Sequence, residues 1–276
     1  CLNLPSVVTG SNPTPSFVWW STSGEVDSTA RPDVFLAHDG RRFAFLVVCG
    51  DQPISLGALE PGDWAQLLAT LGAQNPRIFC SWPTSWCTLI PDALWPSFPL
   101  DRAVLGAPNN TQIYQSVQQK FHAVHSQEAP SEWSNEPGLS NSGFDAFWPS
   151  EALNWELPPV APERTVVVLA HPDCLHISAF ERGGTLVYHN RFDASTTNDA
   201  LYALGLVYEH LGWSGIEVPL FWHGYRADWD SIAQGMGSFV LEIKPLGPPR
   251  GLPNALGDFR MHPSLQTLFR LWLCAS

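Results

Sequence analysis

The feature that most constrains this chain is an order of elements that occurs twice. The pattern of residues 33–82 predicts strands at 33–38, 42–48 and 53–59, a helix at 61–71 and a strand at 77–82. Residues 165–222 repeat that order, with strands at 165–170, 174–181 and 185–192, a helix at 197–211 and a strand at 218–222. Three hairpin-linked strands followed by a crossover helix and a parallel strand form a mixed sheet covered by helices. The sequence therefore predicts a mixed α/β fold built twice on one plan, which indicates an internal duplication.

Local patterns support both copies. Apolar residues fall on one face of each helix, at spacings of three and four residues: Trp64, Leu67, Leu68 and Leu71, then Leu201, Leu204, Tyr208 and Leu211. Ser195 or Thr197 is expected to cap the second helix, and Gly212 to end it. The two copies also contain a short similar segment, "LAHDG" at 36–40 and "LAHPD" at 169–173.

We divide the chain into four parts. Residues 1–30 read as an irregular leader, 31–127 as the first half, 128–163 as a Pro/Ser-rich insertion or connection, and 164–276 as the second half. The second half is expected to continue with a helix at 227–235, a strand at 238–246 and a last amphipathic helix at 263–273.

Two strand-rich halves of this βββαβ kind resemble the actin-like superfamily, in which two ribonuclease-H-like halves face each other across a cleft. The segment "TLVYHNRFDASTTNDALYALGLVYEHLGW" also resembles a narrower group, the uncharacterised bacterial family known as domain of unknown function 3822, found mostly in Bacteroidetes. "CTLIP" at 87–91 and the ending "HPSLQTLFRLWLC" resemble further elements of that family. The matching residues of the long segment are Leu186, Asn190, Phe192, Asp199, Leu201 and Tyr202. The resemblance implies an actin-like ATPase fold and no particular activity.

The two turns that would hold phosphates in an actin-like ATPase are degenerate here. Such turns use glycine N–H groups to hold phosphates and Asp residues to orient Mg²⁺ and water. The first turn keeps Asp39 and Gly40 but lacks a hydroxyl, and Asp-Gly is also a common plain hairpin turn. The second contains Asp173 but begins at Pro172, which has no N–H to donate. We therefore expect no catalytic residue and no cofactor; the alternative is a divergent nucleotide-binding ATPase.

Histidines raise the question of a metal site. His171, His176 and His189 are close in sequence, and His122 and His125 have the spacing of one helix face. His171 and His176 differ by an odd number of residues, which on one strand would point them to opposite faces. No matching cysteine or carboxylate spacing accompanies them. We therefore expect ordinary surface or half-buried histidines and no metal.

Aromatic residues at the ends of two equivalent strands are the remaining signal. Trp82 and Trp86 follow the strand of the first half, and Trp222 and His223 end that of the second. Strand ends open into the cleft of such folds, where ligands bind. These residues are predicted either to line a groove for a protein or peptide partner or to close the core between the halves.

Charge and cysteine content narrow the partners and the compartment. The net charge is −12 and there are two lysines, Lys120 and Lys244, so a nucleic-acid partner is not expected. No apolar run is long enough to span a membrane. The six cysteines show no CxxC pair or zinc-finger spacing, and buried thiols in the reducing cytoplasm explain them. A lipid anchor on Cys1 is the alternative location.

Overall fold

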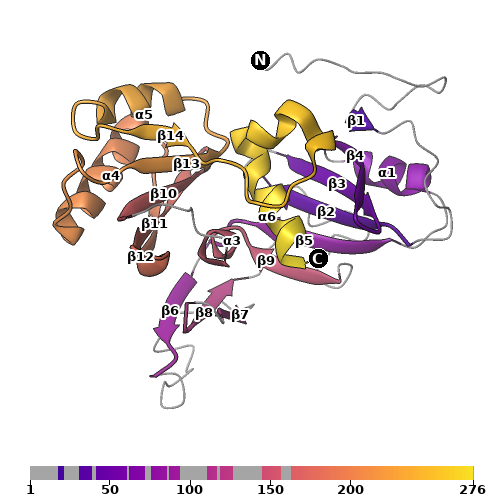
Figure 1. The fold of residues 1–276 in the computed structure, drawn as a ribbon, viewed down its shortest axis with the longest axis horizontal. Coiled ribbons are helices and arrows are strands. Elements are labelled where there is room, and N and C mark those ends of the chain that lie inside the picture. Colours follow the sequence, from indigo (N-terminus) through magenta and orange to yellow (C-terminus); the bar gives the residue numbers. More distant parts are fainter. Residues whose placement is uncertain are drawn as a thin grey trace.

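The described residues form three β-sheets, and helices pack on the two large ones (Figure 1). The fold is that of a computed structural model, which describes residues 18–21, 31–38, 42–60, 62–71, 76–85, 87–93, 111–116, 119–126, 145–156 and 163–275. Within these ranges, no helix combines the length and the apolar character needed to cross a lipid bilayer.

The first sheet has the strand order β1-β4-β3-β2-β5-β9. Its strands are β1 (Val18–Ser21), β2 (Asp33–His38), β3 (Phe43–Cys49), β4 (Gln52–Leu59), β5 (Arg77–Trp82) and β9 (Ala146–Pro149). Neighbours among β2, β3 and β4 pair antiparallel, whereas β5 runs parallel to β2, and β9 runs parallel to β5. Helix α1 (Asp63–Leu71) crosses between β4 and β5 and packs on one face of the sheet through Trp64 and Leu67.

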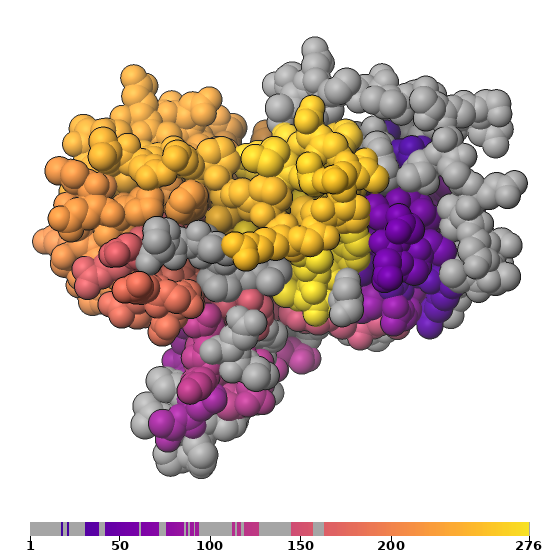
Figure 2. Space-filling model, in the orientation of Figure 1, coloured from indigo at the N-terminus to yellow at the C-terminus, as the bar shows by residue number. Residues whose placement is uncertain are grey.

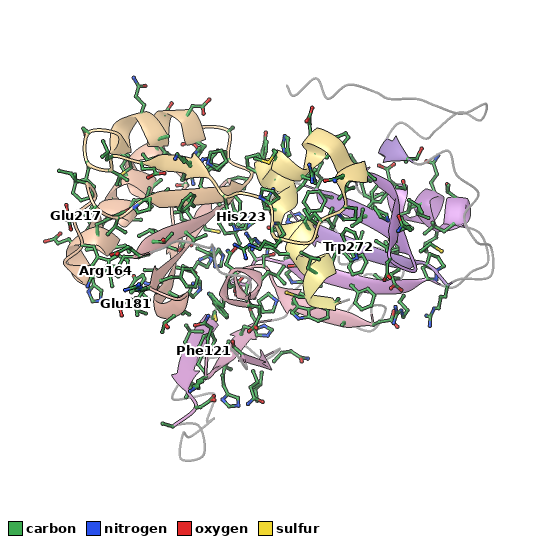
Figure 3. All side chains as sticks on the ribbon, viewed as in Figure 1. Phe121, Arg164, Glu181, Glu217, His223 and Trp272 are labelled. Atoms are coloured by element: carbon green, nitrogen blue, oxygen red, sulfur yellow. The ribbon has the colours of Figure 1, made fainter. Side chains whose placement is uncertain are left out.

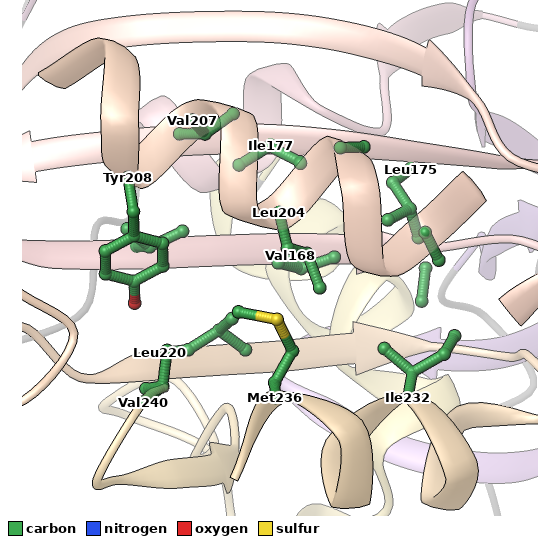
Figure 4. Close-up of a cluster of buried hydrophobic side chains, with 14 of the residues drawn as sticks. Val168, Leu175, Ile177, Leu204, Val207, Tyr208, Leu220, Ile232, Met236 and Val240 are labelled. Atoms are coloured by element: carbon green, nitrogen blue, oxygen red, sulfur yellow. The ribbon is translucent and has the colours of Figure 1, made fainter. Parts of the chain in front are cut away.

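The second sheet has the strand order β12-β11-β10-β13-β14. Its strands are β10 (Thr165–Ala170), β11 (Cys174–Glu181), β12 (Thr185–Asp193), β13 (Leu220–Gly224) and β14 (Ile243–Pro245). Helices α4 (Thr197–Leu211) and α5 (Trp229–Met236) cover one face together. Figure 4 shows Leu204 from α4 and Met236 from α5 in the apolar core that they form with the sheet residues Val168 and Leu220.

Helix α4 begins and ends at residues with strong capping preferences. The Thr196 hydroxyl accepts a hydrogen bond from the Asp199 N–H, and the Asp199 carboxylate accepts one from the Thr196 N–H. Gly212 ends the helix in the left-handed conformation, at φ 62°. The cap is thus Thr196 and not its neighbours Ser195 or Thr197, because Thr196 has the extended backbone that lets its hydroxyl reach the Asp199 N–H.

A small third sheet, of strand order β6-β8-β7, contacts the second half through hydrogen bonds. It consists of β6 (Cys87–Pro91), β7 (Thr111–Ser116) and β8 (Phe121–Ser126). The Gln119 amide, between β7 and β8, donates to the carbonyl oxygens of Trp155 and Gly184 and accepts from the Leu186 N–H, each at 2.9 Å. Trp155 belongs to the short helix α3 (Ala152–Glu156), which packs with Phe121 under the second sheet.

The C-terminal helix α6 (Gln266–Ala275) lies between the two large sheets (Figure 1). It follows two 3₁₀ helices, η3 (Asn254–Met261) and η4 (Pro263–Leu265). Leu268, Phe269 and Leu271 pack on the face of the first sheet opposite α1. Thr267 contacts β13 of the second sheet at His223, and every residue from 266 to 272 is buried. A helix buried on all sides is an internal element.

The prediction of a mixed α/β fold with mixed sheets is confirmed, and the bounds of β2, β5, β10, β11 and α4 agree with those predicted. The predicted strand at 238–246 is wrong over 238–242. There the N–H groups of Phe239 and Val240 donate to the Met236 carbonyl at 2.8 and 2.7 Å, so the chain turns, and only Ile243–Pro245 pairs with β13.

Regular structure also occurs inside 128–163, the range interpreted as an insertion. Strand β9 joins the edge of the first sheet, and α3 follows it with Leu153 and Trp155 fully buried. The C-terminal helix, grouped by sequence with the second half, packs mainly on the first sheet. The domain boundaries themselves stay a prediction.

Candidate functional site

The sequence-predicted site residues are not brought together among the described residues. Asp39, Gly40 and Trp86 lie outside the described ranges. Asp173 is exposed in the turn between β10 and β11. His223 alone lies centrally, between the two large sheets (Figure 3).

The two described tryptophans belong to different cores. Trp82 is 1% exposed in the cluster under α1, and its ring centroid is 4.4 Å from that of Phe147. Trp222 stacks on Trp229 of α5 with ring centroids 4.7 Å apart, in the core of the second half. The partner-binding groove predicted from these residues stays a prediction, and Trp82 contributes to the core.

The turn 171–174 uses its polar groups within the chain. The His171 N–H donates to the Cys174 carbonyl at 3.0 Å, and Pro172 has no N–H. The buried Arg226 guanidinium donates to the carbonyls of His171 and Ala194. The His171 N–H and the Arg226 guanidinium are therefore engaged within the chain, and Pro172 has no N–H to offer.

Arg226 is held in place from its other side. Its Nε donates to Asp228 Oδ1 at 2.7 Å and its Nη2 to Asp228 Oδ2 at 3.3 Å, a two-pronged pair. Asp228 Oδ2 also accepts from the Thr197 hydroxyl at 2.7 Å, at the start of α4. This arrangement ties the turn, the start of α4 and the segment after β13 into one unit.

Four histidines, His171, His176, His189 and His223, form a polar cluster between the halves. The ring centroids of His171 and His176 are 6.0 Å apart, as are those of His176 and His189. The expectation that these are surface or half-buried residues is wrong for His171, His176 and His223, which are at most 1% exposed. The parity argument that separated His171 from His176 fails because the turn at 172–173 lies between them, so they are not on one strand.

A buried carboxyl group lies beside this cluster. Glu151, just before α3, accepts hydrogen bonds from the hydroxyl and the N–H of Thr84. Burial raises the pKa of Glu151 to about 7, although the bonds from Thr84 act in the opposite direction. Its Oε2 is 3.9 Å from His176 Nδ1, which is too long for a hydrogen bond.

Burial favours the neutral form of three of these histidines, His176, His189 and His223. Burial lowers the pKa of His176, and the neighbouring His171 and His189 lower it further. It also lowers the pKa of His223, with Arg270 adding to the effect, and lowers that of His189 to about 3. Neither ring nitrogen of His176 has a hydrogen-bond partner in the described part of the chain. Buried groups of this kind supply neither a solvent-exposed base nor a nucleophile.

No metal centre is assembled by the described residues, since no three or more of their His, Cys, Asp and Glu side chains gather closely enough to hold an ion. His122 and His125 lie on strand β8 rather than on a helix, and His122 Nδ1 is 3.1 Å from Asp92 Oδ1.

Sequence reasoning missed Arg226 and Glu151. A lone arginine just after a buried strand carries no motif, and Glu151 lies in a segment whose prolines indicated an irregular loop. The one usable signal is position, because Arg226 follows the end of β13 at the edge where ligands of such folds bind.

A groove of about 590 Å³ lies on the outer side of α4. Its lining includes Tyr202, Gly205, Leu206 and Glu209 from α4 and Phe239 from the turn after α5. Tyr202 and Phe239 are 72% and 45% exposed. The groove is apolar except for Glu209, whereas the polar cluster between the halves is closed to solvent.

No family model matches the chain, and no curated protein matches it. Among solved structures, it is similar to a protein with actin-like ATPase fold and unknown function from Bacteroides thetaiotaomicron, with a TM-score of 0.64 and 15% identity over 89% of this chain and 99% of that one. It is also similar to the PilM–PilN type IV pilus biogenesis complex, at a TM-score of 0.47 and 12% identity over 88% and 98%. A third similar structure is ethanolamine utilization protein EutJ from Carboxydothermus hydrogenoformans, at 0.42 and 10% over 88% and 89%. The first comparison confirms the predicted actin-like ATPase fold.

Proposed function

We propose that this chain is a non-catalytic protein with the actin-like ATPase fold that acts by binding another protein or peptide. The observation that carries the proposal is the turn 171–174. Its first N–H is used within the turn, its second residue is proline, and Arg226 is engaged with backbone carbonyls and Asp228. Phosphate binding in this fold needs free N–H groups and charges at this place, so the turn favours a structural role.

Exposed apolar residues support the statement that the chain acts by binding. Eight large hydrophobic side chains are exposed among the described residues, and five of them surround the groove on α4 or continue from it: Tyr202, Leu206, Ile216, Phe239 and Leu241. Scattered exposed hydrophobics are ordinary, but a contiguous group of them marks an interaction surface. The function is therefore assigned to the outside of the second half.

A thermal-shift experiment tests the statement that the protein is non-catalytic. A nucleotide present at about 100 times its Kd adds about 2.7 kcal/mol of stability, which raises the melting temperature by several degrees. We expect no shift with ATP, ADP or GTP in the presence of Mg²⁺. A shift, together with ATP hydrolysis that is lost in Asp39→Ala, would overturn the proposal in favour of a divergent nucleotide-binding ATPase.

Affinity purification from the source cells tests the statement that the protein acts by binding. The wild-type chain is expected to retain a protein that Leu206→Glu does not, since the variant places a charge in the apolar groove. Val187→Glu is the matched control, because Val187 is 42% exposed on β12 and is not part of the groove. Equal retention by all three chains would remove the groove from the proposal.

We also propose membership of the uncharacterised family domain of unknown function 3822. Support comes from Leu186, Asn190 and Phe192 on β12 and from Asp199, Leu201 and Tyr202 on α4. Asp199 has a physical reason for retention, because it completes the cap of α4. An alignment of the chain's relatives is the test, and loss of this pattern in them would contradict the assignment.

A cytoplasmic location and the absence of a nucleic-acid partner complete the proposal. Cys49, Cys80, Cys87, Cys174 and Cys274 are free thiols, which a reducing compartment preserves. The charge of −12 repels a phosphate backbone. Fractionation of the source cells and a mobility-shift assay with RNA and DNA test these two statements. The internal duplication is supported by the order β4-β3-β2-β5-β9 of the first sheet, which corresponds to β12-β11-β10-β13-β14 of the second; the first sheet has β1 in addition.

A further inference from the structure

The outward face of α4 carries a short stripe of residues at helical spacing. Tyr202, Gly205, Leu206 and Glu209 follow one another at intervals of three, one and three residues, so they lie on one side of the helix. The opposite side, with Leu204 and Val207, is buried in the core of the second half (Figure 4). Helix α4 lies at the outer edge of that half, away from α6 (Figures 1 and 2).

Gly205 is the unusual member of the stripe. Glycine is disfavoured in a helix interior, and a Cβ added at Gly205 would meet nothing within 4 Å. Packing against the residues that the structure describes therefore gives no reason for the missing side chain. A small residue on an exposed helix face lets a second backbone approach closely, which is a property of helix–helix contacts.

The apolar surface extends past the C-terminal end of α4. The Leu241 N–H donates to the Gly215 carbonyl at 3.1 Å, which places Leu241 beside the loop that carries Ile216. Ile216 and Leu241 are 73% and 77% exposed. Aromatic side chains have roughly 150–250 Å² of surface and aliphatic ones somewhat less, so at their exposed fractions the five residues present on the order of 500 Å² per copy. Two such patches supply the apolar centre of a specific interface, which buries at least about 1,200 Å² in total.

We propose that the occupant of this surface is a second copy of the same chain, bound about a two-fold axis with the two α4 helices antiparallel. This inference rests on the proposed function, of which it names the partner. The axis passes between Gly205 and Leu206, so each Leu206 packs into the notch left by the other copy's Gly205. Each exposed Tyr202 then lies opposite the other copy's Glu209, at the end of the groove where Phe239 lies.

Charge selects this arrangement. Glu209 is the one charged residue among those that line the groove. The antiparallel register places it against a tyrosine hydroxyl, which donates a hydrogen bond, and not against the other Glu209. Two chains of net charge −12 can thus meet here without a like-charge contact across the helix pair. An acidic or a basic peptide would find no row of matching charges in this groove.

Sedimentation equilibrium of the purified full chain, between about 1 and 100 µM, tests the proposal. The wild type is expected to have twice the mass of one chain. Leu206→Glu is expected to raise the dimer Kd by about a hundredfold or more, because it brings two carboxylates to the axis. Val187→Glu should leave the Kd unchanged. Circular dichroism shows that each variant is folded.

A charge exchange between two chains tests the register. Tyr202→Glu places a carboxylate opposite the other copy's Glu209 and should weaken its own dimer. Mixing it with Glu209→Lys should give a heterodimer about tenfold or more tighter than the Tyr202→Glu homodimer. Within one helix the two positions are seven residues, or about 10 Å, apart, so the rescue has to come from the other copy.

Three results would overturn the inference: a wild-type monomer throughout this range, a Leu206→Glu chain that dimerises as the wild type does, or mixtures with no preference for the heterodimer. Binding of a monomeric wild type to neutral phosphatidylcholine vesicles, lost in Leu206→Glu, would assign the surface to a membrane instead. None of these results depends on nucleotide, so a failed dimer leaves the non-catalytic assignment standing, and a nucleotide-induced shift leaves the dimer standing.

Discussion

His189 is buried in its neutral form, so the stability of the folded protein should decrease as the pH falls. Its Nδ1 is 3.0 Å from the Ser178 hydroxyl, and its ring centroid is 4.8 Å from that of Trp155. Burial lowers the pKa of His189 from 6.5 to about 3. Because the unfolded chain binds the proton first as pH falls, the free energy of unfolding decreases between pH 6.5 and 3 and is unaffected above that window.

The size of the effect follows from linkage. Between about pH 7.5 and about pH 5, the shift of His189 alone removes about 2 kcal/mol of stability. Glu151 acts with the opposite sign. Its pKa of about 7 lies above its ordinary 4.5, so the folded state binds the proton first and gains stability as pH falls through that window. Over the same range that gain is also about 2 kcal/mol, and the lowered pKa values of His176 and His223 add further losses as pH falls, so the wild-type curve alone does not isolate His189.

A difference measurement separates them. Urea unfolding of the wild type and of His189→Gln, followed by tryptophan fluorescence at about pH 7.5, 6 and 5, gives the free energy of unfolding of each. His189→Gln should lose about 2 kcal/mol less than the wild type between the first and last pH. His210→Gln, a substitution on the exposed face of α4, controls for the removal of a histidine. Parallel curves for the wild type and His189→Gln would refute the reasoning.

Three further predictions concern the internal contacts. Gln119→Ala removes three hydrogen bonds at 2.9 Å between the third sheet and the second half. The substitution should lower the free energy of unfolding, measured by urea titration, by roughly 1–3 kcal/mol. Gln112→Ala, at an exposed site on β7, is the control and should leave this free energy unchanged. Leu268→Ala in α6 should cost about 2–5 kcal/mol by the same measurement, and a change below 1 would contradict the internal position of the helix. Arg226→Met leaves Asp228 and two carbonyl groups without their donor, and a double-mutant cycle with Asp228→Asn should give a coupling of about 1–3 kcal/mol; additive effects would contradict the pairing.

The elements that could be predicted from the sequence are those whose signals are local. β10 and β11 are continuous apolar runs separated by a turn at Pro172, and α4 has a capping sequence at one end and Gly212 at the other. These features act within a few residues, so the pattern alone indicates the bounds. The repeated order of such elements is also what carried the resemblance to the actin-like superfamily, and that resemblance implied the fold.

Elements that depend on distant partners were missed. β9 has four residues and is a strand because β5 offers it a parallel edge, which no property of "AFWP" indicates. The strand ends carrying Trp82 and Trp222 were matched correctly, but each side chain's direction depends on the face that its own helix covers. Trp82 faces the core under α1, and Trp222 packs against α5. A shared position at the strand end therefore places the two rings in different cores, and the groove stays a prediction.

The contacts between the halves bear on how such a protein can work. Hinge closure of two halves around a ligand requires a space between them that can open and close. In the described part of this chain, that space holds α6, buried on both sides, together with His223 and its 3.4 Å contact to the Thr267 hydroxyl. Opening the halves would expose the apolar side chains of α6 and part the histidine cluster from Glu151. Among the described residues, the outer face of α4 carries a group of exposed apolar side chains, and for that reason the proposed function places binding there.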